Sequence, residues 1–258
     1  MAAIDLEVAG RYIDALPLVE VVRGNEGPTA AGPPLSEGKP QASIVDSNII
    51  TFPESTPLEV RNAVANWTLM AQMAASKAVR DREAVREWMG VYIDVLLKSG
   101  WTVREDEGSE TREALYGSTM YEKILALLAV AFGPVPTALA IVTAALQSLQ
   151  SMNKNSPWIT LFDRRGKSAR SVGFQIANCE TDNSGTAALR GTEFIVEANQ
   201  TLTQVLFFKF TSHEASLYRR ARTLTLSARA LEQLSPKVEE RVLDMASDNI
   251  LAFDLKPV

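Results

Sequence analysis

Cysteine and histidine, which carry much of enzyme and metal chemistry, are almost absent from the sequence. Its 258 residues include a single cysteine, Cys179, and a single histidine, His213. One cysteine excludes an intramolecular disulfide and a metal site built on several thiolates. A catalytic histidine would have to be His213, which no motif surrounds, and the glycine patterns of nucleotide sites and nucleophile elbows are absent. We therefore expect neither an enzyme nor a metal site.

Positive charge is also in short supply. Lysine and arginine number 26 against 31 aspartates and glutamates, so the formal net charge is −5. Such a chain gains little from a phosphate backbone, and we expect no nucleic-acid partner. It could approach anionic lipid only through a local basic patch. Hydrophobic residues make up 46% and charged residues 22%, the proportions of a globular protein with a packed core.

The N-terminal sequence lacks the basic and long apolar regions of a secretory signal. We expect a soluble protein made in the cytoplasm and released or secreted to act elsewhere. Residues 4–16 carry apolar side chains at near-helical spacing and predict a short helix that ends at Pro17. Residues 23–43 are rich in Gly, Pro, Ala and Ser, as a linker is. The expected organisation is an N-terminal arm over 1–43 and one domain over 44–258.

A long stretch without charge lies between Lys123 and Lys154, divided by Gly133-Pro134-Val135-Pro136. A transmembrane helix needs about 20 apolar residues, and each half of this stretch is shorter. A helix that is hydrophobic all round is usually buried, so the pattern predicts two buried helices. A second interpretation stays open, in which the pair is buried in solution and becomes exposed at a lipid surface.

Helices come first along the chain and strands come later, which argues against a doubly wound nucleotide-binding fold. Thr56 as cap and Pro57 as first residue predict one helix start, and Ser235 with Pro236 predicts the start of the last helix. Helices are expected from Pro57 to the charged run 80–83, from Val85 to Gly100, and over 235–250. Strands are expected over 44–52, 101–106, 157–165, 171–179, 187–198, 203–212 and 221–227.

The strand predicted over 203–212 contains four consecutive apolar residues, Val205 to Phe208. A strand with one wet face would alternate apolar and polar residues. This segment is therefore predicted to be a central strand with both faces covered.

Three blocks of the sequence, LQSLQSMNKNSPWITLF, VGFQIANCETDNSGTA and EFIVEANQTLTQVLFFKF, follow one another in this order. They resemble the corresponding blocks of the Cyt-type δ-endotoxins, which are small bacterial cytolysins. The resemblance covers about residues 44–258 and is firmest over 124–212. A fungal cardiotoxic pore former and an enterobacterial virulence factor of plant pathogens use the same fold. The N-terminal arm has no counterpart, and it could be a propeptide or an unrelated extension.

The resemblance implies an α/β three-layer sandwich, with a central, mostly antiparallel sheet wrapped by helical hairpins. Such proteins bind phospholipid, move the helical layer away, and assemble with copies of themselves in the bilayer. A strand in lipid must pair every backbone group, so insertion requires an oligomeric or closed sheet. The membrane-inserting candidates are Phe174, Ile176, Val205, Leu206, Phe207, Phe208 and Phe210.

Two basic clusters are candidates for binding lipid head groups. Arginine forks suit phosphate geometry, and both clusters are expected in turns. The alternative is a solvated turn without a ligand. The candidates are Arg164, Arg165 and Lys167 in one cluster, and Arg219, Arg220 and Arg222 in the other.

Cys179 has two interpretations. A free cysteine is most often a small buried hydrophobic residue. The resemblance to the virulence factor implies instead a fatty acyl thioester at this residue, which would make the chain a lipid- or acyl-binding protein that forms no pore. Apart from such a fatty acid, no cofactor is expected. An enzyme that uses the carboxylates of the acidic stretch Glu105–Glu110 stays open as a third hypothesis.

Overall fold

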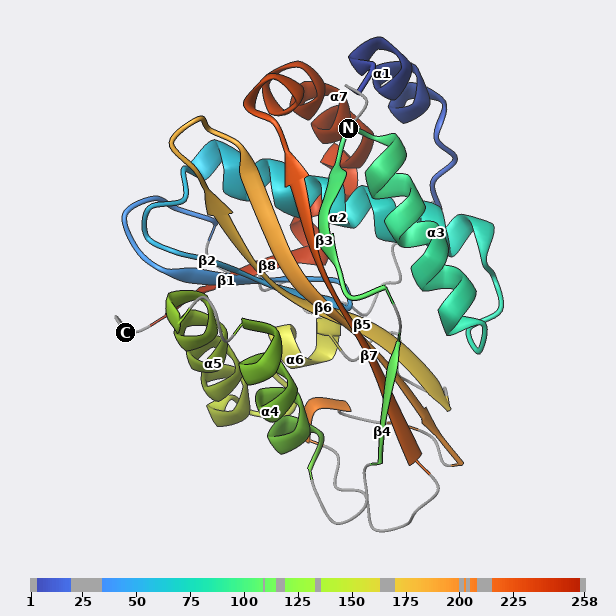
Figure 1. Ribbon diagram of the computed structural model, residues 1–258, viewed down its shortest axis with the longest axis vertical. Helices are drawn as coiled ribbons and strands as arrows, with labels where there is room; N and C mark the ends of the chain where they lie inside the picture. Colours follow the sequence, from blue (N-terminus) through green and yellow to red (C-terminus); the bar gives the residue numbers. More distant parts are fainter. Residues whose placement is uncertain are drawn as a thin grey trace.

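An eight-stranded β-sheet forms the middle of the molecule, between two layers of helices (Figure 1). The computed structural model describes residues 4–19, 34–108, 110–114, 119–132, 136–162, 170–199, 202, 205–207 and 215–255. The predicted α/β three-layer sandwich, with a mostly antiparallel sheet wrapped by helical hairpins, is confirmed.

The strand order is β3-β7-β6-β5-β2-β1-β8, and β3 and β4 pair with successive stretches of β7. Every pair is antiparallel except β2 with β5. The strands are β1 Gln41–Val45, β2 Asn48–Phe52, β3 Thr102–Asp106, β4 Thr111–Ala114, β5 Ser171–Thr181, β6 Ala187–Ala198, β7 Ala215–Leu226 and β8 Ile250–Asp254.

The helices fall into two groups, one on each face of the sheet (Figure 1). The first layer holds α1 Leu6–Ala15, α2 Leu58–Ala78, α3 Val85–Lys98 and α7 Ala228–Asn249. The second layer holds α4 Met120–Phe132, α5 Pro136–Ser151, α6 Pro157–Phe162 and the 3-10 helix η1 Val205–Phe207. The predicted division of the uncharged stretch into two helices is therefore confirmed as α4 and α5.

Each face of the sheet carries its own hydrophobic core, and β5 contributes to both. Phe174 and Ile176 point into the core under α4 and α5, whereas Ala177 and Cys179 point into the core under α2 and α3. The ring of Phe174 lies 5.2 Å from the ring of Phe194 on β6, measured between centroids. Successive residues of a strand face opposite sides, so a strand covered on both sides is apolar at consecutive positions.

The N-terminal helix packs against the last helix. Ala9 and Ile13 of α1 are buried in the core shared with α7, and Lys237 of α7 forms an ion pair with Asp14 at 2.7 Å. Strand β1 begins at Gln41, so removal of residues 1–43 would take away its first three residues.

One predicted strand, over 44–52, is in fact a hairpin. β1 and β2 pair with each other through a two-residue loop, Asp46 and Ser47. Asp46 has a φ of 47°, and aspartate is among the few residues that adopt this left-handed conformation readily. The prediction missed this turn because the loop contains no glycine.

The strand predicted over 157–165 is wrong, because residues 157–162 form helix α6. Ser156 precedes the helix and accepts hydrogen bonds from the N–H of Ile159 on Oγ at 3.4 Å and from the N–H of Thr160 on its carbonyl at 2.9 Å. Pro157 then occupies the first helical position, where its missing N–H costs nothing. The serine followed by proline is a local signal for a helix start. The prediction of a strand rested instead on the apolar composition of WITLF.

Two helix starts also differ from the prediction. The N–H of Leu58 at the start of α2 donates to Glu37 Oε1 at 3.0 Å, while the Thr56 hydroxyl donates to the carbonyl of Cys179 at 3.1 Å. Helix α7 begins at Ala228, where Ser227 Oγ accepts from the N–H of Ala230, so Pro236 lies inside the helix. Strand β8, which follows α7, was not predicted.

Candidate functional site

Three of the predicted head-group arginines lie in the middle of strand β7, not in a turn. Arg219 donates to both carboxylate oxygens of Glu107 at 2.9 Å, and Arg220 donates to Asp106 at 2.8 and 2.7 Å. Arg222 donates to the same Asp106 at 3.0 Å and to Glu193 on β6. The acidic stretch that follows strand β3 therefore binds the arginines of β7 directly.

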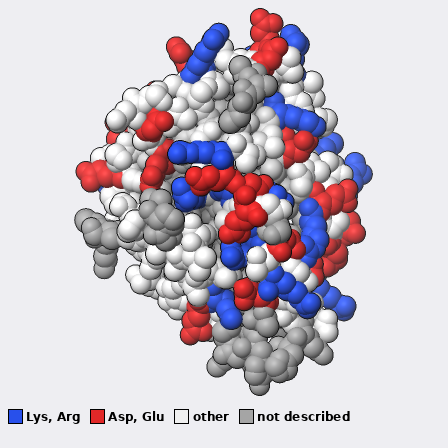
Figure 2. All heavy atoms as spheres, viewed as in Figure 1, with Lys and Arg blue, Asp and Glu red and all other residues white. Residues whose placement is uncertain are grey.

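The same surface holds two more arginines and three more carboxylates. Arg86 of α3 contacts Glu110 and Glu197, and its guanidinium carbon lies 4.1 Å from the ring centroid of Tyr218. Arg190 lies 3.4 Å from Glu105. We call this set the β7 ion network: Arg86, Arg190, Arg219, Arg220, Arg222, Glu105, Asp106, Glu107, Glu110, Glu193 and Glu197. Figure 2 shows the two signs of charge interleaved across this side of the molecule.

Five guanidinium groups face six carboxylates in the β7 ion network, so it has no excess of positive charge. A cavity of about 240 Å³ opens among them, with apolar walls from Met89 and Ile93 of α3. An anion could bind the guanidinium groups only by displacing a carboxylate. The surface that the sequence suggested as a free basic patch is occupied by acids of the same chain.

Two carboxylates of the network have shifted pKa values of opposite sign. Burial raises the pKa of Glu193 to about 7, although Arg222 beside it acts in the other direction. Partial burial also acts to raise the pKa of Asp106, but the hydrogen bonds from Arg220, the Gly108 N–H and Arg222 outweigh it and hold the pKa well below its usual range. Glu193 therefore titrates near neutral pH, while Asp106 stays ionised.

Sequence reasoning did not find Asp106, Glu107 and Glu193 as partners of the arginines. Their separations along the chain, 114 residues between Asp106 and Arg220 for example, cannot be read from local spacing. One signal was present: Glu193 is the single charge in the apolar run 191–196, and a buried charge needs a partner.

Several predicted site residues lie outside the described part of the chain. These are Arg164, Arg165, Lys167, Phe208 and Phe210. Whether the two basic clusters share one end of the sheet therefore stays a prediction.

The strand predicted over 203–212 is wrong for Val205–Phe207, which form η1. Strand β6, which precedes this segment, is already paired on both edges, with β5 and β7, so the segment cannot pair beside it. Leu206 is buried in the core under α4, and Phe207 packs against the same core. Phe174 and Ile176 are fully buried there as well.

Cys179 is fully buried on β5, in the core under α2. Burial raises the pKa of its thiol to about 12, so the thiolate is a minute fraction at neutral pH. Cys179 does not line the cavity at the β7 ion network. S-acylation of this residue stays a prediction, and it would require the thiol to become exposed.

The outer surface of α4 and α5 carries no charge between Lys123 and Lys154. Val130 is 66% exposed, one of the few large hydrophobic side chains that face outward. Figure 2 shows mainly uncharged atoms over α4 and α5, at the lower left, with acidic atoms at the lower edge of this area. The exposed residues of this α4–α5 face are Ala126, Ala129, Val130, Pro136, Thr137, Gln147, Gln150 and Ser151.

No described helix combines the length and the hydrophobicity that crossing a membrane requires. Helices α4 and α5 contain 13 and 16 residues. At a rise of about 1.5 Å per residue they are roughly 20 and 24 Å long, shorter than the roughly 30 Å hydrocarbon core of a bilayer.

Comparison with known proteins gives similarity of structure alone. No protein-family model matches the chain, and no curated protein matches it by sequence. The chain is similar to a solved δ-endotoxin, with 10% identity and a TM-score of 0.36 over 85% of this chain and 96% of the other. It is also similar to the Evf virulence factor, with 13% identity and a TM-score of 0.35 over 92% of this chain and 88% of the other. Both are proteins of the kind that the sequence resembles.

Proposed function

We propose that this chain acts on membranes: it binds phospholipid through the α4–α5 face and then rearranges, assembles with copies of itself and perforates or disrupts the bilayer. The observation that carries the proposal is the absence of charge on that face beyond the first turn of α4, which holds Glu122 and Lys123. A surface helix of a soluble protein normally turns charged side chains outward. An uncharged outer face on two adjacent helices is the arrangement of a surface that meets an apolar partner.

The lengths of the strands support the second step. Strands β5, β6 and β7 contain 11, 12 and 12 residues and pair in register along their length. A tilted strand needs about 9–11 residues to cross the hydrocarbon core. If α4 and α5 moved onto the lipid, Phe174 and Ile176 would lose their cover and present an apolar face. The membrane-entering strands of the proposal are thus β5 to β7, and Val205–Phe207, which form η1, are not among them.

The arginines of β7 have a later role in this proposal. Arg219, Arg220 and Arg222 would bind head-group phosphates once Asp106 and Glu107 move away from them. Charge-assisted hydrogen bonds to phosphate can replace those to carboxylate because both groups present a pair of oxygen acceptors to a guanidinium fork. The proposed action needs no catalytic residue and no cofactor.

The test is release of an encapsulated dye from zwitterionic vesicles, with binding measured by flotation. Val130→Asp places one charge on the α4–α5 face, and Leu243→Asp places the same charge on α7, where Leu243 is 64% exposed. A charge held in the hydrocarbon costs about 2.5–3.5 kcal/mol, and somewhat less at its boundary, so Val130→Asp should lower binding at least tenfold. Leu243→Asp should leave binding unchanged.

Two results would oppose the proposal. Equal effects of both substitutions would remove the α4–α5 face from the argument. If the protein bound vesicles without releasing dye, the lipid-binding part of the proposal would stand and the perforation part would be rejected.

A further inference from the structure

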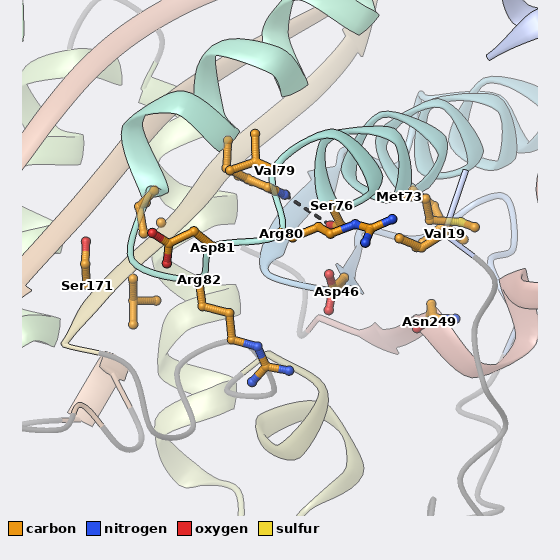
Figure 3. A pocket seen from close by; sticks show the side chains of 15 residues that line it. Val19, Asp46, Met73, Ser76, Val79, Arg80, Asp81, Arg82, Ser171 and Asn249 are labelled. Atoms are coloured by element: carbon orange, nitrogen blue, oxygen red, sulfur yellow. Dashed lines mark hydrogen bonds between the residues drawn. The ribbon is translucent and has the colours of Figure 1, made fainter. Parts of the chain in front are cut away.

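The turn between α2 and α3 lies beside a cavity that plays no part in the proposed membrane action. Its volume is about 310 Å³, at the lower end of the roughly 300–1,000 Å³ typical of small-molecule sites. It is bounded by the end of α2, the start of α3, the start of β5 at Ser171 and the β1–β2 loop at Asp46 (Figure 3). Cys179 lies near the other end of β5, so this cavity is separate from the proposed acylation residue.

Much of the cavity wall is apolar, and packing and a hydrogen bond hold its side chains in place. Leu69 and Met73 come from α2, Val79 from its end, and Val85 and Trp88 from α3. The Trp88 indole N–H donates to Ser76 Oγ at 3.1 Å, and the ring stacks on Tyr92 at a centroid distance of 5.7 Å. A thioether such as that of Met73 adapts to the shape of an apolar ligand.

Two arginines lie at the rim of this wall, and both are exposed. Within the described part of the chain, neither Arg80 nor Arg82 contacts a carboxylate, in contrast to every arginine of β7. Asp81 between them accepts a hydrogen bond from the backbone N–H of Glu83 at 3.0 Å. Figure 3 shows Arg80 and Arg82 extending in different directions from the turn. The rim therefore offers guanidinium groups that the protein leaves available for an anion.

Two acidic side chains, Asp46 and Asp81, line the cavity, and the position of Asp46 sets the direction of binding. Asp46, 9% exposed, lies below Arg80 in the view of Figure 3 and also lines the cavity. Its carboxylate would repel an anion placed next to it and favours an anionic group at the arginine rim, where water and the guanidinium groups meet. An apolar chain has no such preference and is favoured over Met73, Val79 and Trp88.

We propose that this cavity binds a single-chain amphiphile with an anionic head group. The alkyl chain lies over the apolar wall of α2 and α3, and the carboxylate or phosphate lies at Arg80 and Arg82. A fatty acid and an alkyl or lysolipid phosphate share this chemistry. The inference does not depend on action at a bilayer, because the ligand binds from solution.

The experiment is isothermal titration of the full chain with dodecanoate and with dodecyl phosphate, each below the concentration at which it forms micelles. We expect one ligand per chain for at least one of the two, and the preferred one identifies the head group. Dodecyltrimethylammonium, with the same chain and a positive head, and acetate, with a head and no chain, should not bind. From octanoate to dodecanoate, affinity should rise about fourfold per methylene until the cavity is filled, as burial of each group predicts.

Substitutions of the two rim arginines test whether the ligand binds in this cavity or elsewhere on the protein. Arg80→Gln with Arg82→Gln should weaken dodecanoate about tenfold and leave the melting temperature unchanged, because both side chains are exposed. Arg229→Gln is the matched control: it is an exposed arginine on α7 that contacts no carboxylate among the described residues.

Equal binding of the cationic detergent, unchanged affinity in the double variant, or a loss in Arg229→Gln would each overturn the proposal. Dye release is measured on the same variants. Lost dodecanoate binding with intact release would support the cavity as a separate site, so the two proposals can fail independently.

Discussion

Asp106 is the residue at which stability and lipid binding should change in opposite directions. Its carboxylate accepts from Arg220 at 2.8 and 2.7 Å, from Arg222 at 3.0 Å and from the Gly108 N–H at 2.9 Å, and its side chain is 24% exposed. Asp106→Asn keeps the shape and one acceptor but removes the charge. Charge-assisted hydrogen bonds contribute about 1.5–3 kcal/mol each when buried and less when partly exposed. We expect Asp106→Asn to lower the free energy of unfolding by about 2 kcal/mol, which corresponds to roughly 5 °C in melting temperature.

The same substitution should strengthen binding to anionic vesicles. It removes the charge paired with Arg220 and one of the two charges paired with Arg222, and each arginine near an anionic surface contributes about 1 kcal/mol. Binding should therefore rise about tenfold at low salt, and the gain should shrink as salt is added. Flotation with phosphatidylserine-containing vesicles measures binding, and thermal unfolding measures stability.

The control is Asp94→Asn, which removes one carboxylate from an exposed pair with Lys98 at 2.7 Å. Exposed pairs of this kind contribute little to stability because water and salt screen them, so both readouts should stay close to those of the parent. A less stable Asp106→Asn with unchanged vesicle binding would refute the idea that these arginines face lipid. Unchanged stability would refute the contacts themselves.

Two further predictions concern buried groups. The pKa of Glu193 is raised from its ordinary 4.5 to about 7, so the folded state holds this proton more tightly than the unfolded chain does. The stability that the protonated group confers is complete below about pH 4.5 and is lost as the pH rises through 7. Denaturant unfolding measures the free energy of unfolding at pH 5 and at pH 8. Between these two values the parent should lose about 2–3 kcal/mol of this free energy relative to Glu193→Gln. The same pH dependence in both proteins would contradict the shifted pKa. Cys179 is buried, so it should react with a thiol reagent only as fast as the core opens. The intact mass of native protein should show no acyl adduct unless the core opens in the cell. Prompt labelling, or an adduct of fatty acyl size, would favour the acyl-carrying alternative.

Elements with a strong local signal could be predicted from the sequence. The strand predicted over 187–198 is β6 residue for residue, and 171–179 lies within β5. These segments combine apolar patterning with a turn at 182–185, in which Asp182 accepts from the N–H groups of Ser184 and Thr186. These signals are local, because the residues that define a strand between two turns lie close together in the sequence.

The errors arose where tertiary contacts decided the local structure. The apolar residues 205–207 look like a strand, but no sheet edge is left for them between β6 and β7. The cap of α2 comes from Glu37, outside the helix-start pattern that Thr56 offered. In the same way, the basic character of Arg219 to Arg222 was visible, but its neutralisation by residues more than a hundred positions away was not.

The position of β8 bears on how the chain folds during synthesis. This strand is formed by residues 250–254, yet its partner is β1, formed by residues 41–45, and α7 just before it packs on α1. Pairings between distant parts of a chain form slowly, and here the pairing of β1 with β8 must wait until residue 254 has been synthesised. Until β8 leaves the ribosome, β1 has an unpaired edge, and both of its faces belong to the buried interior of the folded protein. A nascent chain stalled before residue 250 should therefore depend on a chaperone that shields this edge, and the finished chain should not.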